Sequence, residues 1–271
     1  MAKFNWFYPT STAEAVTLLQ QKNHIPVGGG TELIHRSLQN VEGLICLKGL
    51  GLDHVSVKGG AVRIGCMATY ADVLRGLGKA DPEHILGISL RHASNTPCRN
   101  RITVGGSIAF IPRWSDLIGP LLALDAKVLL EGRNKGEYPI GEFLSGRKLR
   151  EHSLITEVIF PHRDHRGAHY REVRTASDMP LFTVTVLLET DAALIRKARI
   201  IVAGTAGRVT RLKEAERYLE GKNTDAAGDP AVKELADLHF SGSRSKDAAY
   251  LREKARIVTA RTVRAAAGDR E

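Results

Sequence analysis

The chain has 271 residues, 43% of them hydrophobic and 25% charged, which is typical of a folded globular protein and argues against a disordered, collagen-like or coiled-coil chain. No apolar run approaches the roughly 20 residues of a membrane-spanning helix, and the opening residues lack the basic-then-apolar order of a signal peptide, so we expect a cytoplasmic protein without a membrane span. The net charge of +9 lies mostly in the last 76 residues, but there it is spread over predicted helical faces and not massed in one block, and aromatic residues make up only 6% of the chain, which favours a solvated basic surface over a nucleic-acid interface.

The chain contains three cysteines, Cys46, Cys66 and Cys98, which are far apart in the sequence. An odd, widely spaced set does not form a disulfide framework, and no pair has the two-residue spacing that holds zinc or an iron–sulfur cluster. We therefore expect each cysteine to pack as a small hydrophobic residue. If the protein takes part in redox chemistry, its own cysteines do not carry the electrons.

Helices and strands are mixed along the first half of the chain. Ser11 and Glu14 have the spacing of a capping box, which predicts a helix that begins directly after Ser11. A similar pattern from Thr69 to Asp72 predicts another helix, and a helical stretch is expected at 82–93. Short apolar runs separated by glycine predict strands at 24–27, 44–47, 55–57 and 61–65.

The second half shows the same mixture. A glycine turn is expected after Val104, followed by an apolar helix around 116–124, and Gly268 is expected to end the last helix. Extended runs are predicted at 128–130, 155–160, 182–188 and 198–203, and helices at 210–220, 230–239 and 250–267. This mixture predicts an α/β or α+β fold, with a seam in the polar stretch 161–168.

The first segment that could carry chemistry is the run Gly28-Gly29-Gly30, which follows a short predicted strand and leads to Thr31. Three residues without a Cβ let backbone amides approach a ligand closely, and phosphate is the usual ligand of such a nest. The run matches neither the GxGxxG pattern nor the P-loop, which requires a lysine that does not follow here. A turn of purely structural purpose is the alternative for this segment alone.

The second segment has two glycines, Gly105 and Gly106, between the hydroxyls of Thr103 and Ser107. A second amide-rich turn beside the first could hold both phosphates of a pyrophosphate between them. Asp116 could accept a hydrogen bond from a ribose hydroxyl, although a carboxylate there is also expected at the start of a helix. Two basic residues that precede the segment are interpreted as surface ion-pair residues: Arg99 and Arg101.

Together, the two segments resemble the paired FAD-pyrophosphate loops in the flavoprotein subunit of molybdenum hydroxylases, the family of the carbon monoxide dehydrogenase medium subunit and the xanthine dehydrogenase FAD domain. The stretch from Arg99 to Asp116 is similar to the family's RNRxTxGGN…D signature. The opening helix and the C-terminal part are also similar. The resemblance implies an α+β fold, with a PCMH-type FAD-binding domain at 1–165, whose two subdomains meet near 55–60, and a CO dehydrogenase flavoprotein-type C-terminal domain at 166–271.

The resemblance also implies which residues bind the cofactor. Those around the FAD diphosphate would be Val27, Gly28, Gly29, Gly30, Thr31 and Glu32 on one side and Thr103, Gly105, Gly106 and Ser107 on the other. Asp116 would bond the sugar of the adenosine half, Ile155 would offer backbone contacts to the flavin ring, and Tyr170 matches an aromatic position beside the isoalloxazine. A basic residue that follows this tyrosine in the family corresponds to Arg171 or, with a one-residue shift, to Arg174.

Some positions depart from the family pattern. Ser107 stands where many relatives have asparagine, a change that keeps a hydrogen-bonding side chain. Relatives that attach FAD covalently use a histidine in the first glycine loop, where this chain has Gly30 and Thr31, so FAD is expected to be non-covalent. The chain is somewhat short for the family, and the cysteine-bearing insertion that holds a 4Fe–4S cluster in one branch is absent from the sequence.

Three histidines, His162, His165 and His169, have a spacing of three and four residues that would suit a metal site on a helix. They flank a proline and an arginine- and glycine-rich stretch, so a helix does not follow from the sequence. We favour a solvated loop between domains, and we expect no metal on this chain.

The function that the resemblance implies is the FAD subunit of a three-part complex, with 2Fe–2S clusters on a small partner and molybdopterin on a large one. FAD would take electrons from the clusters and pass them to NAD+ or another acceptor, with no catalytic acid, base or nucleophile from this chain. Three alternatives are a self-sufficient FAD-dependent oxidoreductase of the same superfamily, a basic nucleic-acid-binding protein, and a scaffold subunit that has lost its flavin.

Overall fold

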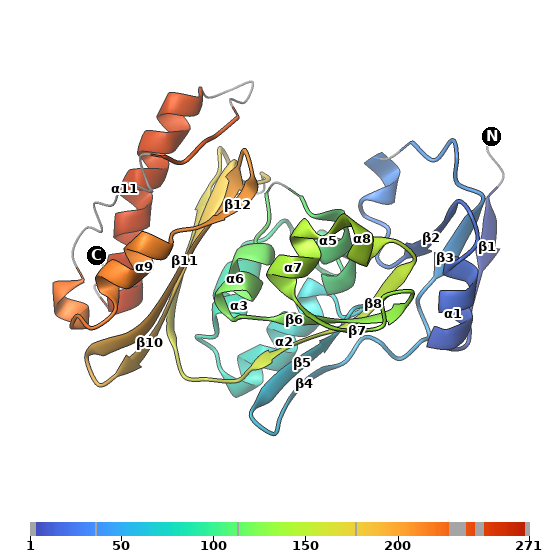
Figure 1. Cartoon of the computed structure of the whole chain (residues 1–271), viewed down its shortest axis with the longest axis horizontal. Coiled ribbons are helices and arrows are strands. Elements are labelled where there is room, and N and C mark those ends of the chain that lie inside the picture. The colour runs from blue at the N-terminus through green and yellow to red at the C-terminus, as the bar shows by residue number, and fades with distance from the viewer. Residues whose placement is uncertain are drawn as a thin grey trace. The chain divides into compact units, whose positions relative to one another are not determined.

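The computed structural model describes residues 4–35, 37–112, 114–176, 178–227, 237–241 and 247–268. The chain forms two compact units, and Figure 1 labels most of their elements. The first unit comprises Met1–Ala80, Asn95–Ile111 and Asp125–His162, and the second comprises Asp81–Ser94, Pro112–Leu124 and Arg163–Glu271. The expected domains divided the sequence once, near residue 165, whereas two short segments before residue 125 pack with the second unit.

The N-terminal part of the first unit is a parallel three-stranded sheet in the order β1-β3-β2, with one helix packed on it. Its elements are β1 (Asn5–Phe7), α1 (Thr12–Leu19), β2 (His24–Val27), the short 3-10 helix η1 (Leu33–His35) and β3 (Gly43–Cys46). Gly43 in the central strand is required by packing, because a Cβ there would lie 2.4 Å from the ring of His24. That ring crosses β3 and reaches Phe7 on the far strand.

The first helix begins as the capping pattern predicts, although one of the two capping bonds differs. The Ser11 hydroxyl accepts a hydrogen bond from the Glu14 amide at 3.2 Å. The Glu14 carboxylate, however, accepts from the Thr10 amide at 2.8 Å and not from the amide of Ser11. The predicted helix start is therefore confirmed.

The larger sheet of the first unit is antiparallel, with the strand order β4-β5-β8-β6-β7. The strands are β4 (Val55–Lys58), β5 (Ala61–Gly65), β6 (Lys127–Gly132), β7 (Gly136–Pro139) and β8 (Ser153–Pro161). Alternate residues of its three central strands, such as Ile64, Val128 and Val158, are fully buried, which is the period-two pattern of a sheet with one face against a core. The helices of this unit are α2 (Tyr70–Ala80), α4 (Thr96–Arg99), α5 (Val104–Phe110), α7 (Ile140–Ser145) and α8 (Arg147–Arg150).

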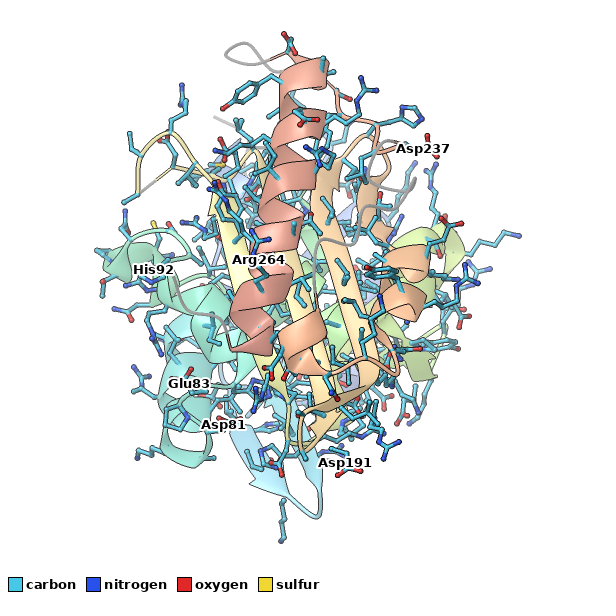
Figure 2. All side chains as sticks on the ribbon, turned by 90° about the vertical axis from the view of Figure 1, so that its left-hand side faces the viewer. Asp81, Glu83, His92, Asp191, Asp237 and Arg264 are labelled. Atoms are coloured by element: carbon cyan, nitrogen blue, oxygen red, sulfur yellow. The ribbon has the colours of Figure 1, made fainter. Side chains whose placement is uncertain are left out.

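The second unit is built on one antiparallel sheet with the order β12-β11-β10-β9. The strands are β9 (Arg166–Glu172), β10 (Phe182–Asp191), β11 (Leu194–Thr205) and β12 (Arg208–Arg211). The helical elements are α3 (Ile85–Arg91), α6 (Ile118–Ala123), α9 (Lys213–Leu219), the 3-10 helix η2 (Thr224–Ala226) and α11 (Ala248–Ala267). Figure 2 shows α11 lying along the sheet.

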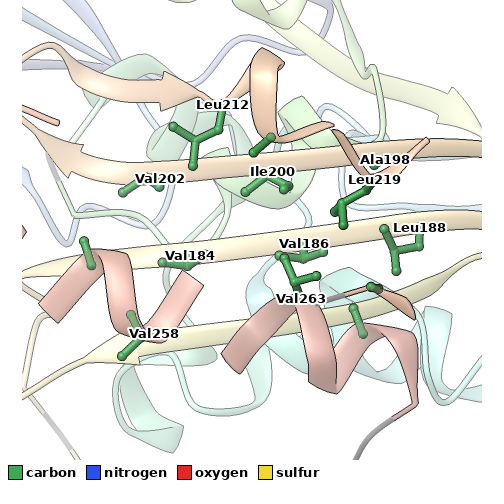
Figure 3. Close-up of a cluster of buried hydrophobic side chains, with 14 of the residues drawn as sticks. Val184, Val186, Leu188, Ala198, Ile200, Val202, Leu212, Leu219, Val258 and Val263 are labelled. Atoms are coloured by element: carbon green, nitrogen blue, oxygen red, sulfur yellow. The ribbon is translucent and has the colours of Figure 1, made fainter. Parts of the chain in front are cut away.

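Alternation along the strands directs side chains to helices on both faces of this sheet. Val184 and Val186 of β10 pack with residues of α9 and α11, as Figure 3 shows. Leu187, on the other face of the same strand, joins a cluster with Ile85 of α3 and Ala123 of α6. Helices therefore cover both faces, and the core of this unit lies in two layers.

The structure confirms the mixed α+β class, and most predicted strands and helices are present near the predicted positions. Several elements differ. The glycine turn expected after Val104 is the first turn of α5, and the helix expected at 210–220 is strand β12 followed by the shorter α9. The strands β1, β7 and β9 and the helices α4, α7 and α8 were missed. Most of the helix expected at 230–239 lies outside the described residues. None of the helices in the described part of the chain has the length and apolarity needed to cross a bilayer.

Candidate cofactor-binding site

The two glycine segments lie against each other in the first unit, although they are far apart in the sequence. A Cβ placed on Gly28 would be 2.7 Å from the Thr103 hydroxyl oxygen. A Cβ on Gly29 would be 1.6 Å from the carbonyl oxygen of Arg101, a distance that no side chain tolerates. The absence of side chains at these two positions is therefore what allows the first loop to approach the second segment.

The first glycine loop presents a row of backbone amides with no partner in the described structure. The N–H groups of residues 28–32 donate no hydrogen bond to any other described residue. Gly30 has φ +74°, in the left-handed region, and a Cβ there would meet only the tip of the Arg101 side chain, at 3.9 Å. The residues from Gly28 to Glu32 are half-buried, whereas Val27 is buried. Successive unpaired amides around a left-handed residue form a concave site for an anion.

The second glycine segment contributes differently from the expectation, because most of its amides already have partners. The Thr103 side chain caps α5 by accepting from the Gly106 amide at 3.2 Å. Three further amides of the segment donate to carbonyl oxygens, namely Val104 to Ala68, Gly105 to Cys66 and Ser107 to Thr103, whereas the Thr103 amide has no partner among the described residues. This segment is therefore a capped helix start that faces the first loop, and it is not a second set of free amides.

Packing against Cys66 leaves no room for a side chain at Gly105. A Cβ on Gly105 would lie 2.6 Å from the Cβ of Cys66 and 2.9 Å from its carbonyl oxygen, inside the unit. Cys66 is buried, as expected, and its burial raises the pKa of the thiol to about 12, against a smaller lowering by a backbone hydrogen bond. The thiol is therefore neutral at physiological pH. Cys46 and Cys98 are free and only partly buried.

Two other residues of the first unit that were predicted to bind the cofactor make defined contacts within the fold. The Ser107 hydroxyl accepts a hydrogen bond from the hydroxyl of Tyr70 at 3.0 Å. Ile155 is buried in β8, where it pairs with Leu130 beyond a bulge in the ladder. The neighbouring strand β5 pairs with β8 only as far as Glu157, so the segment that contains Ile155 extends past the end of that strand.

In the second unit, Asp116 is the centre of a buried polar cluster. Its Oδ1 accepts from Arg171 Nε at 2.7 Å and lies 3.3 Å from His169 Nε2. The side chains of Asp116, His169 and Arg171 are only 8%, 1% and 10% exposed. The other ring nitrogen of His169 lies 3.0 Å from the Thr185 hydroxyl. Sequence reasoning did not find this pairing, because it joins the segment before α6 to strand β9, about 55 positions further along the chain.

Tyr170 and Arg171 point to opposite faces of β9, as adjacent residues of a strand do. The Tyr170 hydroxyl donates to Glu172 Oε2 at 2.6 Å, and its ring lies 6.3 Å from that of Phe182, on the α11 side. Burial and this hydrogen bond raise the pKa of Tyr170 above its ordinary value. Its side chain therefore does not share a face with Asp116. Arg174, the other basic residue considered, pairs with Asp178 and is exposed.

The three histidines are not on a helix. His162 follows β8, and its amide donates to the Gly60 carbonyl. His165 precedes β9, and its Nε2 accepts from the Ile85 amide at 3.2 Å. His169 lies within β9, in the cluster with Asp116. Within the described ranges, no group of three or more His, Cys, Asp or Glu side chains has an arrangement that could hold a metal ion.

This fold and its amide-lined loop correspond to a known class of flavoproteins. Residues 2–163 match the family described as the FAD binding domain in molybdopterin dehydrogenase, and residues 168–266 match the CO dehydrogenase flavoprotein C-terminal domain. The chain therefore belongs to the FAD-binding medium subunits of the molybdenum hydroxylase family, a family of oxidoreductases, and the resemblance seen in its sequence is confirmed.

Two curated relatives and one solved structure match over most of this chain and most of their own length. The nicotine 6-hydroxylase medium subunit of Paenarthrobacter nicotinovorans is 29% identical over 205 residues, which cover 70% of this chain and 72% of that protein. The glyceraldehyde dehydrogenase medium chain of Sulfolobus acidocaldarius is 24% identical over 271 residues, covering 95% and 96%. Among solved structures, a carbon monoxide dehydrogenase from Hydrogenophaga pseudoflava that lacks the Mo-pyranopterin moiety superposes with a TM-score of 0.87 at 25% identity, covering 98% of this chain and 97% of that one.

The residues of the first loop fit the cofactor of this family. FAD carries a diphosphate with two negative charges, and the loop offers five consecutive amide N–H groups with no other described partner. A Cβ at position 30 would stand in the open space beside these amides. The fit depends on backbone groups, which is why three consecutive glycines were a better signal in the sequence than any side chain.

Proposed function

We propose that this chain holds FAD as the electron-transfer cofactor of a molybdenum hydroxylase complex, in which the flavin receives electrons from 2Fe–2S clusters and discharges them to NAD+ or another acceptor. The observation that supports the proposal most directly is the row of unpartnered amides at residues 28–32, held against the capped start of α5. The membership in the FAD-binding family supports the choice of FAD over other diphosphates.

Each group of predicted residues has a defined task in this proposal. The loop from Val27 to Glu32 binds the diphosphate through its amides, and Thr103 and Gly106 form the adjoining wall. In the same unit, Ser107 would continue this wall beside the diphosphate and Ile155 would offer backbone contacts to the flavin ring. For the second unit, three contacts with FAD are proposed on the basis of the family pattern alone: the sugar at Asp116 and the flavin at Tyr170 and Arg171.

The chain's own contribution is binding and electrostatics. FAD, when bound, supplies the exchange between one-electron and two-electron transfer, and the protein supplies position. The amides of the first loop would offset the diphosphate charge without a lysine, because each N–H contributes a fixed partial positive charge. The loop contains Gly30 and Thr31 and no histidine, which supports a non-covalent attachment.

The partners belong to the same proposal. Relatives are named as medium subunits, and another, from Paenarthrobacter nicotinovorans, is named as a subunit of a 6-hydroxypseudooxynicotine dehydrogenase complex. We propose a small 2Fe–2S subunit and a large molybdopterin subunit as partners of this chain. The redox centres of the proposed complex would then be divided among three chains: molybdopterin on the large subunit, 2Fe–2S clusters on the small subunit and FAD on this chain.

The test is the absorbance spectrum, from about 300 to 600 nm, of the chain alone and of the complex with its co-produced partners, after incubation with FAD and gel filtration. Flavin bands that persist through the column and are released by acid are the expected result. A folded protein that stays colourless in both preparations would contradict the proposal. With the coloured complex, bleaching by the substrate and recovery with NAD+ or an artificial acceptor would then identify the acceptor.

A pair of matched glycine variants makes this test specific to the loop. Gly30→Ala and Gly59→Ala both place a Cβ on a residue with positive φ, at +74° and +60°, and neither Cβ would clash: at position 30 it would meet only Arg101 Nη2 at 3.9 Å, and at position 59 nothing within 4 Å. Each should cost about 1 kcal/mol of unfolding free energy through backbone strain. Only Gly30→Ala should lower flavin retention, because Gly59 lies in the β4–β5 turn. Equal retention by the two variants would show that the loop is not the binding site.

A further inference from the structure

Arg101 makes its contacts with the first glycine loop, and not with a surface acid as its sequence context suggested. Its Nη2 donates to the Gly29 carbonyl oxygen at 3.1 Å, and its Nε lies 3.4 Å from the same atom. Among the described residues, no carboxylate forms an ion pair with it. The side chain therefore bridges the two glycine segments from the second segment to the first.

The bond to Gly29 fixes the direction of the next amide. Peptide bonds are planar and trans, and the described chain has no cis bond, so the Gly29 carbonyl and the Gly30 N–H point in opposite directions. A guanidinium that holds the carbonyl on one side turns the Gly30 N–H toward the other. It also removes from the concave side a carbonyl oxygen that would repel a phosphate.

The same side chain brings a permanent positive charge to the loop. A guanidinium stays protonated at any physiological pH. A Cβ on Gly30 would be 3.9 Å from Arg101 Nη2, so the charge lies next to the loop that carries the unpartnered amides, on the side of the Gly29 carbonyl. The attraction between this charge and an anion would be screened by salt, because the Arg101 side chain is exposed.

We propose that Arg101 is a positioning residue for the FAD diphosphate, which presets the first loop through the Gly29 carbonyl and adds a fixed cation beside its amides. This inference rests on the proposed function and deepens it, because it assigns to one side chain a role in binding that the amides alone do not fill. It also explains why a loop without a lysine can hold two negative charges.

Arg99 provides a matched control two residues earlier. It has the same side chain and charge, but its Nη2 donates to the Thr96 hydroxyl at 2.8 Å, within its own short helix. A change at Arg99 alters the net charge of the protein by the same amount as one at Arg101. The comparison therefore separates the effect of losing one positive charge from the effect of losing the contact with Gly29.

The test is the dissociation constant of FAD for the full-length chain and for the variants R101Q, R99Q and R101K, measured by flavin fluorescence at low and high salt, with the thermal midpoint of each. We expect R101Q to bind FAD about tenfold more weakly than R99Q and to lose part of the salt dependence. R101K keeps the charge but not the guanidinium geometry, so it should retain the salt dependence with an intermediate affinity.

The outcomes separate the inference from the proposed function. If the wild-type chain binds FAD and R101Q binds it as tightly as R99Q, the role of Arg101 is wrong while the cofactor site stands. The same conclusion follows if R101Q is weaker but keeps the full salt dependence. If the wild-type protein does not bind FAD at all, the proposed function fails. If R101Q does not fold, the FAD dissociation constants of R101K and R99Q are compared instead. Weaker binding by R101K than by R99Q would support the role of Arg101, and equal or tighter binding would contradict it.

Discussion

Replacing Asp116 by asparagine tests whether this carboxylate is an anchor of the second unit or a ligand of the cofactor. The substitution keeps the size of the side chain and an acceptor oxygen but removes the charge. In the structure, that charge faces Arg171 at 2.7 Å and His169 at 3.3 Å, with all three side chains at most 10% exposed. The variant therefore leaves a buried guanidinium without its counter-ion.

The expected loss of unfolding free energy lies in the range known for buried ion pairs. Removing one partner of a buried ion pair costs about 3–5 kcal/mol. Arg171 keeps a second bond, from Nη2 to the Asp178 carbonyl at 3.3 Å, so we expect a value at the lower end. A loss of about 3 kcal/mol corresponds to a fall of roughly 6–12 °C in the thermal midpoint of a domain of this size.

The assay is thermal and urea unfolding of Asp116→Asn beside Asp191→Asn, with the dissociation constant of FAD measured on both. Asp191 pairs with Arg196 at 2.7 Å in the same unit, but its side chain is 68% exposed, so its loss should leave the midpoint unchanged. If Asp116→Asn also unfolds at the wild-type temperature and only its FAD affinity falls, the carboxylate is a ligand and the anchor role is refuted.

Two further results are expected from the packing of the first unit and the charge state of the second. Gly105→Ala should lower the free energy of unfolding by about 2 kcal/mol, since its Cβ would press on Cys66. Gly78→Ala, in α2 with nothing within 4 Å of the new Cβ, should raise the free energy of unfolding by about 0.5–1 kcal/mol. Urea unfolding of both variants measures this contrast, and equal effects would contradict the packing argument. The raised pKa of Tyr170 means that its neutral form is favoured in the folded protein, so the associated stability is present below pH 10 and is lost only as the pH rises well above it. In an alkaline absorbance titration, Tyr170→Phe should therefore match the wild type up to the unfolding transition, and one tyrosine fewer titrating near pH 10 would contradict this.

The elements with regular patterns were predictable from the sequence, and those that depend on distant partners were not. The last helix could be placed from its apolar spacing and from Gly268, which adopts φ +113° as its left-handed cap. Strand β9 was missed because its sequence, RGAHYRE, is polar where strands are usually apolar. Its polar residues are satisfied by Asp116, Thr185 and Glu172, contacts that only the folded sheet provides.

The two glycine segments show most clearly where sequence reasoning stops. Both could be recognised as places where the backbone needs room, and the prediction that they lie side by side is confirmed by the hydrogen bond from Arg101 to the Gly29 carbonyl. The amino-acid sequence alone predicted the same role for both segments, as amide-rich turns that bind a pyrophosphate. Among the described residues, the first segment has five consecutive unpartnered amides, whereas the carbonyls of Cys66 and Ala68 and the Thr103 side chain accept most of those at the start of α5.

A glycine can be selected for a positive φ, for close packing or for an accessible amide, and its neighbours in space decide which of these applies. Gly30 has a positive φ beside open space, and Gly105 has an ordinary φ against a buried wall. A substitution at either position would reduce bound FAD, but by different routes. At position 105 the loss should accompany unfolding, whereas at position 30 it should exceed the loss of stability. Measuring both quantities on both variants therefore assigns the roles that the sequence leaves open, and parallel losses at position 30 would show that its glycine serves the fold alone.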